Sequence, residues 1–114
     1  MTAYRKWDIL LVPFPFTDLT TAKKRPALVV SPDVYNRSGP DLVIAFITSH
    51  MDVAPRPGDH PIRFWKEAGL PKASLLRMKF ATIDREIVLK RLGRLHPPEH
   101  GRVRAVLSEF FAES

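Results

Sequence analysis

Short apolar runs alternate with proline-rich and polar segments along most of the chain. Each run is rich in Val, Ile and Leu and shorter than a typical helix, which predicts a β-strand. The predicted strands span residues 7–14, 25–31, 41–48, 61–65, 74–83 and 89–95. The run at 41–48 lacks polar alternation, so we expect it to be buried on both faces or to lie centrally. Pro13 should end the first strand, because proline has no N–H to donate.

The final segment has the periodicity of a helix instead. Its apolar residues recur at i, i+3, i+4, i+7 and i+8, which places them on one helical face. These residues are Val103, Val106, Leu107, Phe110 and Phe111. A proline at 97 or 98 suits the first turn of that helix. Short strands, long loops and one terminal helix predict a mainly β fold, a small and strongly curved β-barrel capped by the helix.

Length and composition narrow the class of protein. The 114 residues predict a single domain spanning 1–114. The chain has no cysteine, which excludes a disulfide framework and cysteine zinc sites. No apolar run approaches the roughly 20 residues of a membrane span, and Asp8 and the following prolines interrupt the first apolar stretch before it resembles a signal peptide. We therefore expect a soluble, cytoplasmic protein.

Charge adds a partner class to this picture. Eighteen Lys and Arg against twelve Asp and Glu give a net charge of +6, which favours nucleic acid or an acidic protein as partner. A basic surface that serves only solubility is the alternative. Residues 23–25 concentrate three cations directly before an apolar run. Such a cluster either binds a phosphate or is simply a solvated charged segment.

Several segments resemble the MazF/PemK family of toxin–antitoxin endoribonucleases, in the same order and at similar spacings. They are "WDILLVPFPFTDLTTAKKRPALVVSPDVYN", "DLVIAFITS", "KFATIDREIV" and "LKRLGRL", followed by the amphipathic helix. The resemblance implies an SH3-like β-barrel with a C-terminal α-helix, assembled as a homodimer. It also implies a type II toxin that cleaves single-stranded RNA or mRNA without metal or cofactor, and a cognate antitoxin protein that covers the RNA groove.

Two catalytic residues follow from the matching motifs, Arg25 in "RPALVVS" and Thr48 in "ITS". A guanidinium offers a rigid fork of donors for phosphate, so Arg25 would stabilise the negative charge of the phosphorane transition state. The Thr48 hydroxyl would orient the scissile phosphate or the 2′-hydroxyl. Attack by the 2′-hydroxyl leaves a 2′,3′-cyclic phosphate and a 5′-hydroxyl. The alternatives are a solvated cation at Arg25 and a strand-end cap at Thr48.

RNA-binding candidates surround these two positions: Phe14, Phe16, Lys23, Lys24, Ser49 and His50. Aromatic rings stack unpaired bases, and Phe14, Phe16, Trp7 and Trp65 are the candidates, although each such residue is more often part of a core. We expect His96 and His100, beside the helix start, to face solvent. His50, Asp52, Asp59 and His60 could be imagined around a metal, but their irregular spacing matches no zinc signature.

One position departs from the family pattern, since Trp7 stands where the family usually has a glycine before the acidic residue of the first strand. If that glycine makes room for RNA, the indole would narrow the pocket. A second class of function also remains, a non-enzymatic relative that acts by binding protein, as gyrase-poisoning toxins on this barrel do. The presence of both Arg25 and Thr48 favours the enzyme, because a protein binder has no chemical need for that pair.

Overall fold

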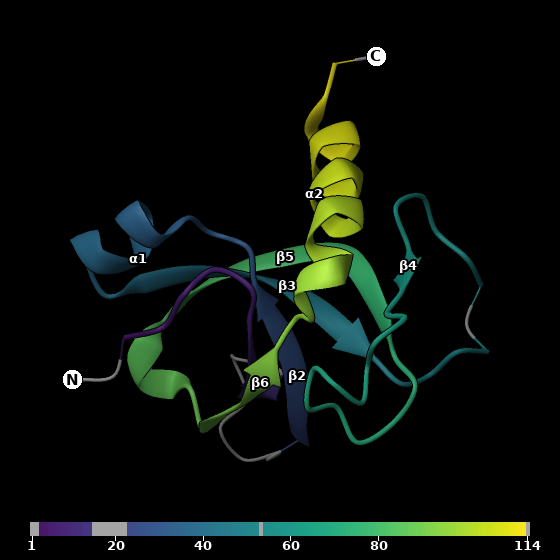
Figure 1. The fold of residues 1–114 in the computed structure, drawn as a ribbon. Helices are drawn as coiled ribbons and strands as arrows, with labels where there is room; N and C mark the ends of the chain where they lie inside the picture. Colours follow the sequence, from purple (N-terminus) through teal and green to yellow (C-terminus); the bar gives the residue numbers. More distant parts are fainter. Residues whose placement is uncertain (1–2, 15–22, 53, 114) are drawn as a thin grey trace.

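The computed structural model describes residues 3–14, 23–52 and 54–113, and one curled antiparallel sheet forms its body (Figure 1). Within these residues the strands are β1 (Asp8–Phe14), β2 (Lys23–Val29), β3 (Asp41–Thr48), β4 (His60–Pro61), β5 (Leu75–Asp84) and β6 (Lys90–Arg94). Their order in the sheet is β4-β5-β3-β2-β1-β6, so β3 lies in the interior as predicted. The helices are α1 (Asp33–Ser38), the 3-10 turn η1 (Arg85–Ile87) and α2 (Pro97–Phe111). The predicted mainly β architecture with a C-terminal helix is confirmed.

Two apolar clusters cover the two faces of the curled sheet. Successive strand residues point to opposite faces, so Leu28 and Ala27 belong to different clusters. The first cluster lies beneath α2 and includes Ile9, Leu28, Ala45, Ile47, Leu76 and Val103. The second includes Leu10, Val12, Ala27, Val29, Leu42 and Ile44. This alternation decides which residues can meet at the ends of the strands.

β1 continues through Pro13 to Phe14, and β2 begins at Lys23, two residues earlier than predicted. Pro13 pairs with Lys24 on the β2 side. Its nitrogen points to the other side, where β6 begins only at Lys90, opposite Leu11. No neighbouring strand therefore needs an N–H at Pro13. The prediction that Pro13 ends the strand was wrong for this reason.

The prediction of a strand at 61–65 was also wrong, because β4 consists of His60–Pro61 and is followed by turns. The backbone N–H groups of Arg63 and Phe64 donate to the carboxylate of Glu99, at 2.7 and 3.0 Å. A side chain from α2 thus replaces the neighbouring strand as hydrogen-bond acceptor. The segment is bent against the base of the helix instead of extending the sheet.

The loop that follows β4 packs closely on β6 at two glycines. A Cβ on Gly93 would lie 2.1 Å from the Ala68 carbonyl oxygen, and one on Gly69 would lie 2.3 Å from that of Leu92. Gly69 also has φ +88°, a conformation that favours glycine. The close approach predicted at Gly93 is confirmed, together with a register shift in β1 opposite it, between Ile9 and Leu10. This contact fixes the loop as one wall of the site described below.

The apolar face predicted for the terminal helix is only partly buried. Val103 is fully buried, whereas 43% of Phe110 and 66% of Phe111 is exposed. Both rings contact Phe80 of β5, with centroids 5.6 and 5.1 Å away, but α2 rises above the sheet at this end and the rest of each side chain is exposed (Figure 1). Among the residues described, none of the helices combines the length and apolar character needed to cross a bilayer.

Candidate functional site

The predicted site residues gather at one end of the sheet. β1 ends at Phe14, β2 begins at Lys23 and β3 ends at Thr48, and antiparallel pairing brings these three termini to the same edge. In Figure 1 this is the lower end, from which β2 rises. We call this edge the strand-end rim; it comprises Phe14, Lys23, Lys24, Arg25, Thr48 and Ser49.

Arg25 and Thr48 lie on the same face of the sheet. Arg25 pairs with Val12, a residue of the second apolar cluster, so its side chain leaves β2 on that face. β2 and β3 pair from Val29↔Ile44 to Ala27↔Phe46. The same register places Arg25 and Thr48 at corresponding positions just beyond this pairing. The two residues expected to be catalytic are therefore neighbours across two strand ends.

The Arg25 guanidinium is not neutralised by any described residue. Arg25 is half-buried, and its side chain makes no hydrogen bond or ion pair with residues 3–14, 23–52 and 54–113. Two other arginines differ, since Arg77 binds the Asp59 carboxylate at 2.9 Å and Arg94 binds that of Asp8 at 2.9 Å. Because a guanidinium holds its charge at any physiological pH, Arg25 offers a fixed cation to an anionic ligand.

Thr48 has both a structural and a chemical capacity. Its Oγ1 accepts a hydrogen bond from the backbone N–H of His50 at 3.1 Å, which caps the end of β3. The hydroxyl proton is not used by that bond and can be donated to a phosphate oxygen. His50 itself is exposed, and the structure places it in the turn that follows β3.

An aromatic pair lies on the Arg25 face of the rim. The rings of Phe14 and Phe46 are 5.2 Å apart in an edge-to-face arrangement. The Lys79 ammonium lies 5.6 Å from the centre of the Phe14 ring and 5.5 Å from that of Phe46. Sequence reasoning identified Phe14 but missed Phe46 and Lys79, although strand alternation back from Thr48 could have found Phe46. Phe16, the other predicted stacking residue, falls outside the described residues.

A cavity of about 480 Å³ opens on the opposite face of the rim. Lys24, Arg25, Lys72 and Lys90 supply its cations, and among the described residues no Asp or Glu lines it. The other lining residues are Leu11, Pro26, Ile47, Ser49, Gly69, Pro71, Ser74 and Leu92. Lys24 and Ser49 were predicted site residues, whereas Lys72 and Lys90 come from distant parts of the sequence and were missed. Lys23 is exposed and pairs with Phe14 on the edge of the sheet.

The imagined metal site is not assembled. Among the described residues no three or more His, Cys, Asp or Glu side chains are grouped so that they could share an ion. Asp59 accepts two hydrogen bonds from Arg77, and this interaction holds the pKa of the carboxyl below its ordinary value. His60 instead contacts Glu99 at 2.7 Å, near the base of α2. The two neighbours in sequence thus have separate structural partners.

Trp7 occupies a backbone conformation that explains a preference for glycine at this position. Its φ is +77°, in the left-handed region. The N–H of Trp7 donates to the carbonyl of Val29, and its carbonyl accepts from the N–H of Leu95. These two hydrogen bonds fix the conformation between β2 and β6. The indole is 6% exposed, stacks on the His100 ring at 4.8 Å and does not line the cavity beside Arg25. The prediction that it could narrow the pocket at Arg25 is not supported by this position.

A buried carboxylate organises the base of α2. Glu99 is 1% exposed and accepts hydrogen bonds from two backbone N–H groups and from the His60 ring. Burial is the largest single effect on its pKa and raises it, but the hydrogen bonds together outweigh burial and leave the pKa below its ordinary value. His96 and His100 are also packed, against Phe64 and Trp7, so the prediction that they face solvent was wrong.

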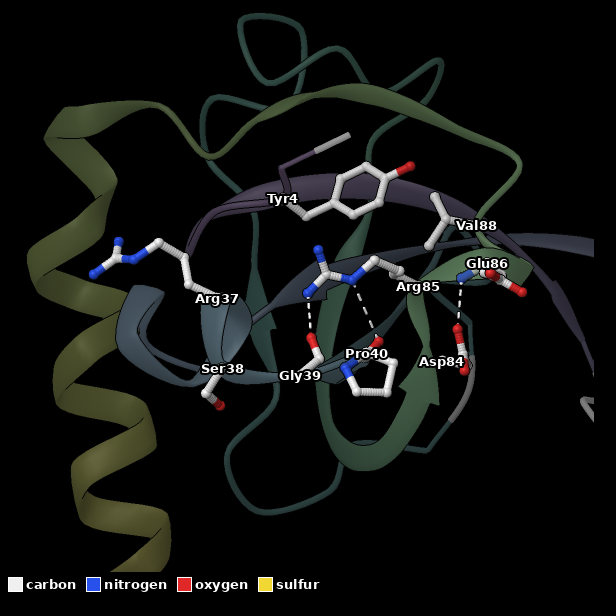
Figure 2. A pocket seen from close by; sticks show the side chains of 9 residues that line it. All are labelled: Tyr4, Arg37, Ser38, Gly39, Pro40, Asp84, Arg85, Glu86 and Val88. Carbon is white, nitrogen blue, oxygen red and sulfur yellow. Dashed lines mark hydrogen bonds between the residues drawn. The ribbon is translucent and has the colours of Figure 1, made fainter. Parts of the chain in front are cut away.

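A larger hollow, about 700 Å³, lies at the other end of the sheet (Figure 2). Arg85 reaches into it, and the figure shows its guanidinium turned toward the backbone of Gly39 and Pro40. It donates to carbonyl groups at and beyond the end of α1, those of Asn36, Gly39 and Pro40. Asp84 and Glu86 add negative charge to the lining. Arg85 therefore holds α1 in place, and the carboxylates of Asp84 and Glu86 distinguish this hollow from the cavity at the rim.

Comparison with known proteins relates this geometry to a family. The profile of the PemK-like, MazF-like toxins of type II toxin–antitoxin systems matches residues 5–111. None of the curated protein sequences matches the chain. Among solved structures, an endoribonuclease from a mycobacterial species, in complex with its cognate antitoxin, has a TM-score of 0.76 at 15% identity and covers 98% of this chain and 100% of its own.

Two further structures show the same fold. The MazE–MazF complex from Deinococcus radiodurans (Form-III) has a TM-score of 0.74 at 20% identity, with 99% of this chain and 100% of the other covered. The Mycobacterium tuberculosis toxin MazF-mt6 has a TM-score of 0.71 at 18% identity, with 91% and 95% covered. These likenesses establish the fold, and the profile match establishes the relationship. The chain belongs to the PemK-like, MazF-like toxin family of type II toxin–antitoxin systems.

Proposed function

We propose that this toxin is an endoribonuclease that cleaves single-stranded RNA in the cytoplasm without a metal ion. The observation that carries the proposal is Arg25, a cation without a partner among the described residues, placed on the same face and edge as Thr48. The aromatic pair Phe14–Phe46 beside them offers faces on which an unpaired base can stack. Family membership supports the same activity.

In the proposed reaction the ribose 2′-oxygen attacks the adjacent phosphorus, and the bond from phosphorus to the 5′-oxygen breaks. The 2′-hydroxyl loses its proton, the 5′-oxygen gains one, and the products are a 2′,3′-cyclic phosphate and a 5′-hydroxyl. Arg25 stabilises the charge that develops on the non-bridging oxygens of the phosphorane. Thr48 donates its hydroxyl proton as a hydrogen bond to a phosphate oxygen, which orients the phosphorus for attack.

The proposal includes two protein partners. A cognate antitoxin would cover the basic rim with an acidic segment, because the chain carries a net charge of +6. Antitoxin complexes of the mycobacterial and Deinococcus relatives support this pairing. We also propose a homodimer, whose two-fold axis would extend the RNA groove across both protomers. Light scattering of the purified toxin at micromolar concentration tests this, and a monomer would contradict it.

The direct test of activity uses end-labelled single-stranded RNA and purified toxin with excess EDTA. We expect cleavage, with a 2′,3′-cyclic phosphate at one new end and a 5′-hydroxyl at the other. Loss of cleavage in EDTA, restored by a divalent metal, would assign to a metal the role given to Arg25. Absence of cleavage under all conditions, in a preparation that still arrests growth, would favour the non-enzymatic alternative.

A further inference from the structure

The cavity lined by Lys24, Arg25, Lys72 and Lys90 borders the arginine of the proposed chemistry, but Lys72 and Lys90 have no part in that chemistry. We infer that it binds a second nucleotide of the same RNA strand, next to the one that is cleaved, and that Lys72 and Lys90 hold its phosphate. This inference rests on the proposed function for the identity of the ligand. Its support comes from the charge, construction and position of the cavity.

The charge of the cavity selects an anion. Within residues 3–14, 23–52 and 54–113, four cationic residues and no carboxylate line it, whereas Asp84 and Glu86 line the hollow at Arg85. Lys72 and Lys90 are exposed, and neither makes an ion pair with any described residue. Like-charged side chains gathered without counter-ions repel one another, so a bound phosphate would relieve this repulsion. Lysine is a suitable point charge for that purpose.

The two lysines come from elements that are fixed relative to each other. Lys90 lies on β6 and pairs with Leu11 of β1. Lys72 lies on the loop after β4, where its carbonyl accepts a hydrogen bond from the Ser74 hydroxyl at 2.8 Å. The close contact of Gly69 and Gly93 joins that loop to β6. The cationic wall is therefore preorganised and does not depend on a ligand to bring its parts together.

The rest of the lining suits a base. Leu11, Pro26, Ile47 and Leu92 contribute apolar surface, and Ser49 contributes a hydroxyl at the β3 end. The volume of about 480 Å³ lies within the usual range of small-molecule sites. An apolar floor with a cationic mouth matches the two ends of a nucleotide, a flat base and a phosphate. A bare inorganic anion would leave the apolar floor unused.

The position of the cavity connects it to the proposed reaction. Lys24 and Arg25 are consecutive residues at the start of β2, so their side chains leave the strand on opposite faces. Arg25 also borders the cavity. An RNA strand that crosses the rim can therefore place one phosphate at Arg25 and the next nucleotide in the cavity. A separate acidic peptide would have no need of this continuity.

The test measures binding separately from cleavage. The probe is a fluorescent single-stranded RNA of mixed sequence with 2′-O-methyl groups throughout, which cannot undergo attack by a 2′-hydroxyl. The variant Lys72→Gln/Lys90→Gln is compared with Lys66→Gln/Arg102→Gln, which removes the same charge from exposed positions outside the cavity. We expect the first variant to bind about tenfold more weakly than the second. Its slope of log affinity against log salt should be smaller by about 0.7, the value for one lost single-strand phosphate contact.

The charge-preserving variant Lys72→Arg/Lys90→Arg should bind as the wild type does. Equal affinity and equal salt slope in the two glutamine variants would overturn the inference. So would a selective loss of binding to a glutamate-rich peptide with RNA binding unchanged, because the cavity would then take a protein segment. Cleavage of unmodified RNA is scored in a separate assay. A wild type that binds the methylated probe through these lysines and fails to cleave would refute the proposed function alone.

Discussion

Two arginines at opposite ends of the sheet show how the same side chain can support either the fold or a ligand. Arg85 follows β5 and donates to backbone carbonyls at the end of α1, so its hydrogen-bonding capacity is used within the chain (Figure 2). Arg25 lies at the start of β2 and has no such partner among the described residues. The Arg85 guanidinium is thus occupied by the chain's own carbonyls, whereas the Arg25 guanidinium has no described partner and is proposed to bind RNA.

The carboxylates follow the same rule. Glu99 is buried and satisfied by three donors, and Asp8 is buried against Arg94. No acidic residue in the described part of the chain lines the cavity at the rim. Acidic groups therefore stabilise the base of α2 and the start of β1, while the cations at the rim stay unneutralised by the residues described. Substitutions in the two regions should separate stability from activity.

The largest stability effect is expected for Glu99→Gln. The carboxylate accepts hydrogen bonds from backbone N–H groups, and the amide nitrogen of glutamine cannot accept them. Each buried N–H donor left without an acceptor costs about 1–3 kcal/mol of stability. We expect the free energy of unfolding in urea to fall by about 3 kcal/mol. The cleavage rate of the folded protein should not change. An unaltered unfolding midpoint would contradict the structural role of Glu99.

Acid should reveal the same carboxylate. Because the folded pKa of Glu99 lies below its ordinary value of 4.5, its stabilising effect is complete above about pH 4.5 and is lost as the pH falls through the folded pKa. The free energy of unfolding of the wild type, measured in urea, should therefore decrease below about pH 4.5. Glu99→Gln should lack this part of the pH dependence, and identical pH profiles for the two proteins would contradict the assignment.

A smaller loss of stability is expected for Trp7→Gly. Removing a buried Trp side chain costs about 3–5 kcal/mol, while glycine relieves about 1–2 kcal/mol of left-handed strain. The net expectation is a loss of about 2–3 kcal/mol with the RNA cleavage rate unchanged. The control Trp7→Phe keeps a ring against His100 and should lose less. Faster cleavage by Trp7→Gly without a stability loss would instead place the indole in the path of the RNA.

Thr48 should show the smallest effect, on activity. Thr48→Ala removes the donor to the phosphate and should slow cleavage about tenfold, within the range seen when one positioning contact is lost. Thr48→Ser keeps the hydroxyl and should retain most of the rate. Both variants are compared by single-turnover cleavage of saturating RNA. Equal rates for Ala and Ser would show that Thr48 only caps β3 through the bond to His50.

Local patterns predicted most of the fold because each strand and the final helix have their own periodicity. Residues 41–48 were predicted with the bounds that β3 has in the structure. The strand prediction at 61–65 failed because of a residue far away in the sequence. Glu99 lies more than thirty residues from the backbone N–H groups whose hydrogen bonds it accepts. Hydrophobic periodicity contains no information about such a bond.

The site was predictable only where motifs are contiguous. Arg25 and Lys24 belong to one basic cluster, so a single stretch of sequence predicts both as site residues. Lys72 and Lys90 join them through folding of the loop onto β6, which no spacing in the sequence indicates. The left-handed backbone conformation of Trp7 could not be predicted either, because the residue at this position is not glycine. Whether Arg25 and Thr48 act on RNA stays a prediction.

The most direct test compares Arg25→Lys with Arg85→Lys in EDTA. Single-turnover cleavage of saturating single-stranded RNA and urea unfolding are measured on the same preparations. Arg25→Lys keeps the charge but loses the two-pronged donor geometry, so cleavage should fall by about 100-fold or more with unfolding unchanged. Arg85→Lys should retain the wild-type rate and lose about 1–2 kcal/mol of stability, because lysine cannot reach all the carbonyls. A wild-type rate in Arg25→Lys, or the reverse pattern in the two variants, would contradict the account.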